Sequence, residues 1–185
     1  PEETVYTPPT QGEKLNLFGE NLGGFGGKLF LRRKGTTTDE EIAVANTPDG
    51  LYYTADIPTG SGANHTLSYQ VGGQNATLVT TFSYMPPKIA STFPETAGTD
   101  GKTELTITGT NFGVDPKTVV AIGSCPDTGR CNCNVTSITH DKIVCRVPQW
   151  QGKDLPITIN AGGLITDGSF LFSFTPAKVM GVEYK

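Results

Sequence analysis

Hydrophobic and polar residues alternate along most of this chain in short runs, and Gly, Pro, Asn or Asp separates one run from the next. Such alternation turns every second side chain toward a core, as in a half-buried β-strand. In the second half of the chain we expect strands at residues 103–109, 118–123, 133–138, 142–147, 155–161 and 169–175. In the first half we expect strands at residues 14–19, 28–33, 41–46, 51–57, 66–71 and 78–84.

The two halves are related by an internal repeat of 90 residues. A shift of this length superimposes two Gly-x-Asn-x-Gly motifs, formed by Gly19, Asn21 and Gly23 and by Gly109, Asn111 and Gly113. Glycine in such a motif supplies positive φ and asparagine bonds its own backbone, so we interpret the motif as a scaffold turn rather than a ligand site. Each copy has six or seven short strands, which is typical of a two-sheet sandwich. The fold class we predict is therefore all-β, with two tandem two-sheet β-sandwich domains.

The boundary between the copies should fall at Pro86 and Pro87, because consecutive prolines cannot donate hydrogen bonds within a central sheet. We expect one domain over residues 1–86 and a second over residues 87–176. Residues 177–185 repeat the opening of the second copy at the same offset. They should form the opening strand of a third copy or a linker to a further domain.

Composition supports a β fold and argues against several functions. The 185 residues include 23 Gly and 13 Pro, which disfavour helix interiors. No run approaches the roughly 20 apolar residues that cross a bilayer. The formal net charge is −4, so we do not expect the basic surface that binds nucleic acid phosphates. The sequence opens at Pro1 without a signal segment, so any signal peptide or membrane anchor should lie outside these residues.

The motifs of the second copy resemble those of the IPT/TIG family of immunoglobulin-like domains. They are the turn Gly109-Thr-Asn111-Phe-Gly113, the hairpin Cys133-Asn-Val-Thr-Ser-Ile138 and the exit Cys145-Arg-Val-Pro148. The resemblance implies two tandem domains of this family, the first of them divergent and without cysteine. It also implies a fragment of a cell-surface receptor or adhesion protein, such as a plexin-type receptor or a TIG-repeat allorecognition protein of social amoebae.

Four cysteines lie in the second copy, at Cys125, Cys131, Cys133 and Cys145. The first copy has Ala43 and Ala55 at the positions equivalent to the last two, and the joint loss of both sulfurs is what a bonded pair predicts. We therefore expect one disulfide between Cys133 and Cys145 and another between Cys125 and Cys131. A zinc cluster is the competing interpretation, although Cys131-x-Cys133 is tighter than the usual two-residue knuckle spacing.

Three Asn-x-Thr or Asn-x-Ser sequons, at Asn64, Asn75 and Asn134, join the cysteines in favouring an oxidising secretory compartment. We expect Asn64 and Asn134 on the surface near strands and Asn75 in a loop, each able to carry a glycan. The alternative is that these sequons arose by chance in a Thr-rich chain. The location we predict is extracellular, on a cell surface.

The sequence shows no constellation for catalysis or for binding a metal or cofactor. The two histidines, His65 and His140, lie in polar, turn-like surroundings that predict exposed loop residues rather than catalytic bases. Carboxylates occur singly or in the cluster Asp39-Glu40-Glu41, without the spacing of an EF-hand. We therefore expect neither enzymatic activity nor a cofactor.

Protein binding through surface loops is the function that remains. The candidate partner-binding residues are Phe25, Arg32, Arg33, Lys34 and Trp150. We expect the basic run to pair with the acidic cluster Asp39-Glu40-Glu41 across one end of the sandwich; the alternative is an exposed basic patch for an acidic partner. We expect Trp150 to cover a sandwich end; the alternative is an anchor for a partner.

These observations predict a non-catalytic extracellular binding module. The resemblance to TIG-repeat proteins implies that it serves cell–cell adhesion or self/non-self recognition, with an identical or a paralogous surface protein as its partner. The alternatives are passive spacer domains of a plexin-type or growth-factor-receptor-type signalling protein, or of a secreted carbohydrate-active or surface protein. A transcription factor of the same fold would need basic DNA-facing loops and a reducing compartment, which the charge and the cysteines disfavour.

Overall fold

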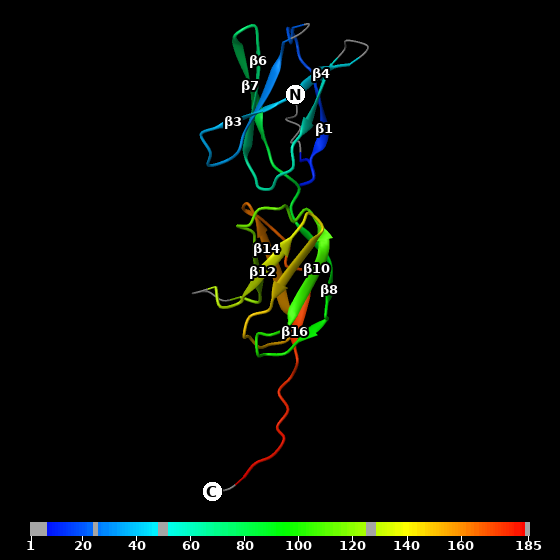
Figure 1. The fold of residues 1–185 in the computed structure, drawn as a ribbon, viewed down its shortest axis with the longest axis vertical. Helices are drawn as coiled ribbons and strands as arrows, with labels where there is room; N and C mark the ends of the chain where they lie inside the picture. Colours follow the sequence, from blue (N-terminus) through cyan, green and yellow to red (C-terminus); the bar gives the residue numbers. More distant parts are fainter. Residues whose placement is uncertain (1–6, 24–25, 48–51, 125–128, 184–185) are drawn as a thin grey trace.

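The computed structural model describes residues 7–23, 26–47, 52–124 and 129–183. Within these ranges the chain forms two β-sandwiches stacked end to end, without helices (Figure 1). The described part therefore contains no helix that could span a membrane. Residues 175–183 form no secondary structure and extend away from the second sandwich (Figure 1).

The first sandwich consists of two antiparallel sheets, with strand orders β1-β5-β4 and β3-β2-β6-β7. The strand bounds are β1 Glu13–Leu17, β2 Lys28–Arg32, β3 Asp39–Ile42, β4 Val44–Asn46, β5 Tyr53–Ile57, β6 His65–Val71 and β7 Gln74–Phe82. Alternation along β2 and β6 directs Leu29, Leu31, Leu67 and Tyr69 into the space between the sheets, where all four are buried.

The second sandwich is one continuous path of strands, β8-β10-β13-β12-β11-β14-β16-β9, with β15 added beside β14. The bounds are β8 Lys88–Phe93, β9 Thr96–Ala97, β10 Glu104–Thr110, β11 Val119–Ile122, β12 Asn132–Ile138, β13 Lys142–Arg146, β14 Leu155–Ala161, β15 Leu164–Ile165 and β16 Leu171–Phe174. Strand β12 pairs with β11 and with β13, so it connects the two layers of the sandwich. Phe172 and Phe174 point inward from β16, as the alternation predicts.

Most strands lie close to the expected ranges, but β7 begins four residues earlier than expected, and β8, β9 and β15 were not among the expected strands. The single strand expected over residues 41–46 is two strands, because β3 pairs with β2 in one sheet and β4 pairs with β5 in the other. The change of sheet occurs at Ala43, which is exposed. A strand that moves from one layer of a sandwich to the other bends at that point, which interrupts its pairing.

The expected opening strand at residues 177–185 is not present within residues 177–183. Its counterpart 90 residues earlier, β8, is a strand because it pairs with β10 along its length. No strand of the described chain lies beside residues 177–183, whose Val179, Met180 and Val182 are exposed. Both expectations for this segment, a linker and the opening strand of a third copy, therefore stay predictions.

Candidate functional site

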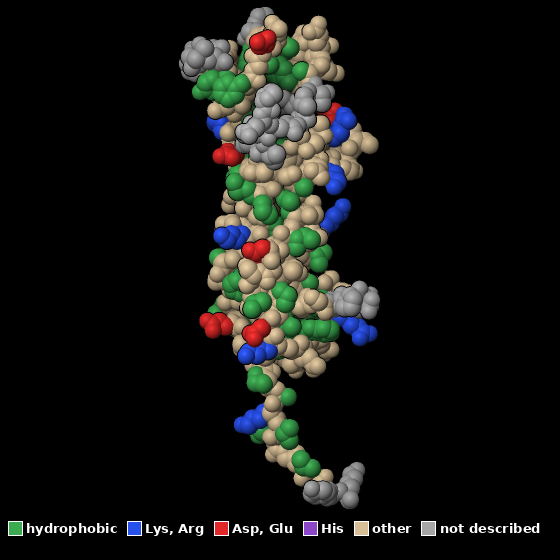
Figure 2. All heavy atoms as spheres, turned by 180° about the vertical axis from the view of Figure 1, so that it is seen from behind, with side chains coloured by type: hydrophobic (Ala, Val, Ile, Leu, Met, Phe, Trp, Pro, Cys, Tyr) green, Lys and Arg blue, Asp and Glu red, His purple; other side chains and the backbone are tan. Residues whose placement is uncertain are grey.

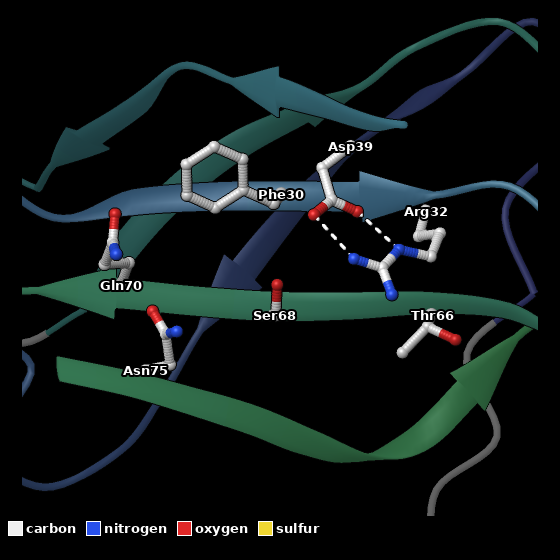
Figure 3. A pocket seen from close by; sticks show the side chains of 7 residues that line it. All are labelled: Phe30, Arg32, Asp39, Thr66, Ser68, Gln70 and Asn75. Carbon is white, nitrogen blue, oxygen red and sulfur yellow. Dashed lines mark hydrogen bonds and ion pairs between the residues drawn. The ribbon is translucent and has the colours of Figure 1, made fainter. Parts of the chain in front are cut away.

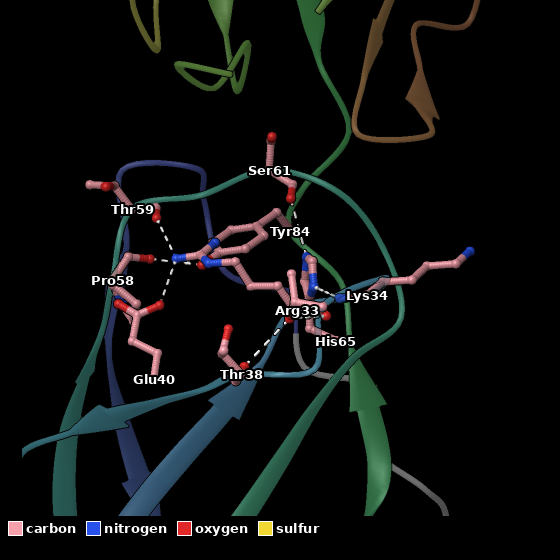
Figure 4. Close-up of polar contacts among 10 residues, drawn as sticks. Arg33, Lys34, Thr38, Glu40, Pro58, Thr59, Ser61, His65 and Tyr84 are labelled. Carbon is pink, nitrogen blue, oxygen red and sulfur yellow. Dashed lines mark hydrogen bonds and ion pairs between the residues drawn. The ribbon is translucent and has the colours of Figure 1, made fainter. Parts of the chain in front are cut away.

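The basic run Arg32-Arg33-Lys34 begins at the last residue of β2, and its two arginines form ion pairs with the acidic cluster. The register of β2 and β3 places Arg32 directly opposite Asp39, and its guanidinium donates to both carboxylate oxygens at 2.7 and 2.8 Å. These hydrogen bonds hold the pKa of Asp39 below its usual value. Arg33 donates to Glu40 at 3.1 Å and to the carbonyl of Thr59 at 3.1 Å (Figure 4).

Lys28 completes this set with an ion pair to Glu41 at 3.0 Å. The three pairs are exposed, and exposed pairs of this kind contribute little to stability. Their effect on recognition is larger, because each paired cation is no longer free to attract an acidic partner. Figure 2 shows both charge signs interspersed along the length of one face of the molecule.

The third residue of the basic run, Lys34, lies at a cleft of about 430 Å³ between the two sandwiches. We call this space the junction cleft. The first sandwich contributes Arg33, Lys34 and residues 59–63 to it, and the second contributes residues 114–117 and Gly162. Neither the Lys34 ammonium nor the Lys117 ammonium has an ion-pair partner within the described ranges. Lys34 extends away from the ion pair of Arg33 (Figure 4).

Direct contacts between the sandwiches hold this cleft in shape. The backbone N–H of Thr10 donates to Oδ1 of Asn111 at 3.3 Å, and its hydroxyl lies 2.9 Å from Nδ1 of His140. Thr10 is only 1% exposed. The asparagine of the repeated motif therefore does more than shape its own turn, because it also accepts a hydrogen bond from the preceding sandwich.

Two further contacts tighten the junction. Leu164 of the second sandwich packs against the core of the first. The backbones of Gly62 and Gly162 approach so closely that a Cβ on Gly162 would lie 2.7 Å from the Cα of Gly62. Such proximity requires glycine at that position, so the sequence encodes the contact between the two units.

The expectation that His65 lies exposed in a loop is wrong. The residue is on β6 and only 4% exposed, with its ring 5.2 Å from that of Phe82 and 5.5 Å from that of Tyr84. Its Nδ1 accepts from the backbone N–H of Lys34 at 3.1 Å, and Nε2 lies 3.1 Å from the carbonyl of Ser61. Burial lowers the pKa of His65. The neutral ring therefore joins the strand end to the loop that lines the junction cleft.

His140 also differs from the expected exposed loop residue, because it is partly buried against Thr10 at the junction. Both histidines thus have structural roles between or beside the sandwiches. Within the described ranges, no group of three or more His, Cys, Asp or Glu side chains is arranged to hold a metal ion.

Trp150 is partly buried and packs against the core of the second sandwich. Its indole nitrogen lies beside Gly123, and together with Thr99, Gln149 and Gln151 it lines a depression of about 480 Å³. This position is the one expected of a side chain that covers a sandwich end. The other loop candidate, Phe25, lies outside the described residues.

The structure links Cys133 to Cys145, across the adjacent strands β12 and β13. Cys131 is also disulfide-bonded, and its expected partner Cys125 lies outside the described residues. A zinc site built on these thiolates is therefore incompatible with the structure, since Cys131, Cys133 and Cys145 are all in disulfides.

The three sequon asparagines, Asn64, Asn75 and Asn134, are exposed. Asn64 has a positive φ of 59° just before β6, and Asn134 lies on β12. Asn75 does not lie in a loop, as expected, but is the second residue of β7. The hairpin between β6 and β7 is so tight that Gly72 and Gly73 alone form its turn, and pairing begins again at Gln74.

Residues 87–175 match the family model described as the IPT/TIG domain. No curated protein sequence matches the chain. Among solved structures, the chain is similar to the surface glycan-binding protein PbSGBP-B from Prevotella bryantii, with a TM-score of 0.52 and 16% identity over 91% of this chain and 38% of that chain. It is also similar to the full extracellular region of plexin A4, with a TM-score of 0.47 and 18% identity over 91% of this chain and 17% of that chain. At such identities the likeness shows the fold alone.

Proposed function

We propose that this chain, in which residues 87–175 form an IPT/TIG domain, is a non-catalytic recognition module from the extracellular part of a cell-surface protein. In this proposal residues 1–86 form a second, divergent domain of the same family, and residues 87–176 form the matched one. The module mediates cell–cell adhesion or self/non-self recognition by binding a protein. The partner is an identical or a paralogous chain.

The extracellular location is supported by cysteine chemistry and by the sequons. Disulfides persist in oxidising compartments and are rare in the cytosol, and the described cysteines are all bonded. The asparagines of all three sequons are exposed and thus accessible to glycosylation.

The observation that carries the binding proposal is that two ammonium groups at the junction cleft, those of Lys34 and Lys117, have no ion-pair partner among the described residues, although Asp115 also lines the cleft. They come from different sandwiches, so the cleft exists only when the two units are joined. Unpaired surface charges steer and orient protein partners. Because the chain has a net charge of −4, another copy offers carboxylates that these lysines can attract.

Clustering of protein-coated beads tests the adhesive function. We expect beads that carry the oxidised chain to cluster with one another, and we expect the double variant K34E/K117E to cluster less. The matched control is K142E/K178E, which makes the same charge change on exposed lysines outside the cleft that also have no ion-pair partner in the described residues. Wild-type beads that remain dispersed would contradict adhesion between copies and would favour the spacer function.

The alternative function is that of a passive spacer in a signalling receptor or in a secreted carbohydrate-active or surface protein. The contacts among Thr10, Asn111 and Leu164 support it, because they join the sandwiches end to end as a spacer requires. The two functions differ in the bead assay, since a spacer holds other domains apart and does not itself bind a second copy.

A further inference from the structure

The outer face of the sheet β3-β2-β6-β7 has a shallow depression of about 360 Å³ (Figure 3). Phe30, Ser68 and Gln70 line it, and so does the sequon residue Asn75. Phe30 is turned outward because its neighbours Leu29 and Leu31 point into the core. The ring is therefore only partly buried, on the solvent side of the sheet.

The strand register places these side chains in a diagonal row. Asn75 is opposite Gln70 across β6 and β7, and Gln70 is opposite Lys28 across β6 and β2. Phe30 is two residues beyond Lys28 on the same face of β2. With strands about 4.8 Å apart and about 3.4 Å between successive residues, the Cα atoms of Asn75 and Phe30 are about 12 Å apart.

The lining chemistry suits a neutral, hydroxyl-rich ligand with one apolar face. The Ser68 hydroxyl and the Gln70 amide have no hydrogen-bond partner in the described part of the chain, so both can bond a ligand. The charges at the far end, Arg32 and Asp39, neutralise each other in their ion pair. Phe30 supplies an apolar ring surface of the kind on which the C–H face of a sugar packs.

We propose that this depression holds the first two sugars of a glycan N-linked to Asn75, with the second sugar packed on Phe30. The proposal rests on the proposed function in one respect, which is passage through a secretory compartment. Attachment forms a bond between Nδ2 of Asn75 and C1 of the first N-acetylglucosamine. It breaks the bond from that C1 to the oxygen of a lipid diphosphate donor, and it releases the lipid diphosphate and one amide proton.

Covalent attachment is what makes so shallow a site sufficient. A tethered sugar experiences an effective concentration in the millimolar range, so a weak contact with Phe30 is populated without a deep pocket. Asn75 itself lines the depression, whereas Asn64 precedes β6 at the junction end and Asn134 is in the second sandwich. Glycans at the last two positions therefore serve as internal controls.

This arrangement separates two surfaces of the first sandwich. The glycan covers the outer sheet face from Asn75 to Phe30, and protein partners are excluded from that face. The junction cleft at Lys34 lies at the other end of β2 and stays open.

The test uses the chain secreted from a eukaryotic host with isotope-labelled glycans. Mass spectrometry of glycopeptides should find Asn75 occupied. In NMR spectra, the sugar C–H protons of the Asn75 glycan should be shifted upfield by the Phe30 ring, and those of the Asn134 glycan should not. The upfield shift should vanish in F30A and in the more conservative F30L, and it should persist in F93A, which removes a ring that is 76% exposed in the second sandwich.

An unoccupied Asn75, or sugar shifts that do not depend on Phe30, would overturn the proposal. A second arm titrates the unglycosylated variant N75Q with free N,N′-diacetylchitobiose, for which we expect no saturation at micromolar sugar because the tether is missing. Saturation there would show an open receptor site for external sugars and would also overturn it. These readouts are independent of bead clustering, so each proposal can fail without the other.

Discussion

Gly109 and Gly19 occupy the same place in the repeated motif but have different surroundings. A Cβ on Gly109 would lie 2.1 Å from the carbonyl oxygen of Lys88 and 2.6 Å from the ring of Phe112, whereas a Cβ on Gly19 would meet only the flexible Leu22 side chain at 3.1 Å. We expect G109A to lower the free energy of unfolding by about 2 kcal/mol or more and G19A to have little effect. Urea unfolding of both variants measures the difference, and equal losses would contradict the close β8–β10 contact.

His65 makes the stability of the first sandwich depend on pH. Burial lowers the pKa of this ring below its usual value of 6.5, so below that pH the unfolded chain binds more protons than the folded chain. Stability is therefore complete above pH 6.5 and is lost as the pH falls toward the folded-state pKa. We expect a lower melting temperature at about pH 5 than at about pH 7.5, and a smaller difference in H65Q. An unchanged pH dependence in H65Q would show that other groups cause it.

At the scale of strands, the disulfide between β12 and β13 is the main covalent constraint described in the structure. It closes a loop with a sequence separation of 12 residues. For a loop of that size, we expect its removal in C133A/C145A to cost about 3 kcal/mol of unfolding free energy. If the two sandwiches unfold separately, the melting temperature should fall only for the transition of the second sandwich, which contains this disulfide. A double variant as stable as the wild type would contradict a structural role for this bond.

Most strands were predictable because each sandwich buries one face of a strand, and this produces an alternation of hydrophobic and polar residues along the sequence. The alternation also indicated that His65 is buried, because His65, Leu67 and Tyr69 share one face of β6 and all three are buried. The polar residues next to His65 in the sequence suggested an exposed loop instead. The break at Ala43 was not predictable. It depends on which neighbouring strand each half pairs with, and the hydrophobic pattern continues unchanged from Ile42 to Val44.

At the scale of the whole molecule, the junction depends on side chains that the repeat makes directly comparable. Asn111 and Asn21 both have positive φ, at 61° and 59°, which glycine also adopts. Only Asn111 accepts a hydrogen bond from Thr10 of the other sandwich. We expect N111G to broaden the distribution of angles between the sandwiches and N21G to leave it unchanged. Residual dipolar couplings measure this, and equal effects would contradict the role of Asn111 at the junction.

The candidate site was predictable only in part, because it depends on how the two sandwiches are placed against each other. The acidic and basic runs near residues 32–41 indicated ion pairs by their charge alone, and Arg32 and Arg33 form them. The sequence did not identify Lys117 as a candidate binding residue, because Lys117 reaches the junction cleft only through the placement of one sandwich against the other. Substitution of Arg32 or Arg33 would also leave Asp39 or Glu40 unpaired, so Lys34 and Lys117 are the cleaner probes of partner binding.

Surface plasmon resonance of the soluble chain over the immobilised chain tests the central claim most directly. We expect saturable binding, and we expect K34E/K117E to weaken it by about tenfold or more, since charge reversal turns attraction at the junction cleft into repulsion. The control K142E/K178E should bind like the wild type. Equal affinity of wild type and K34E/K117E, or an equal loss in the control, would contradict recognition through the junction cleft.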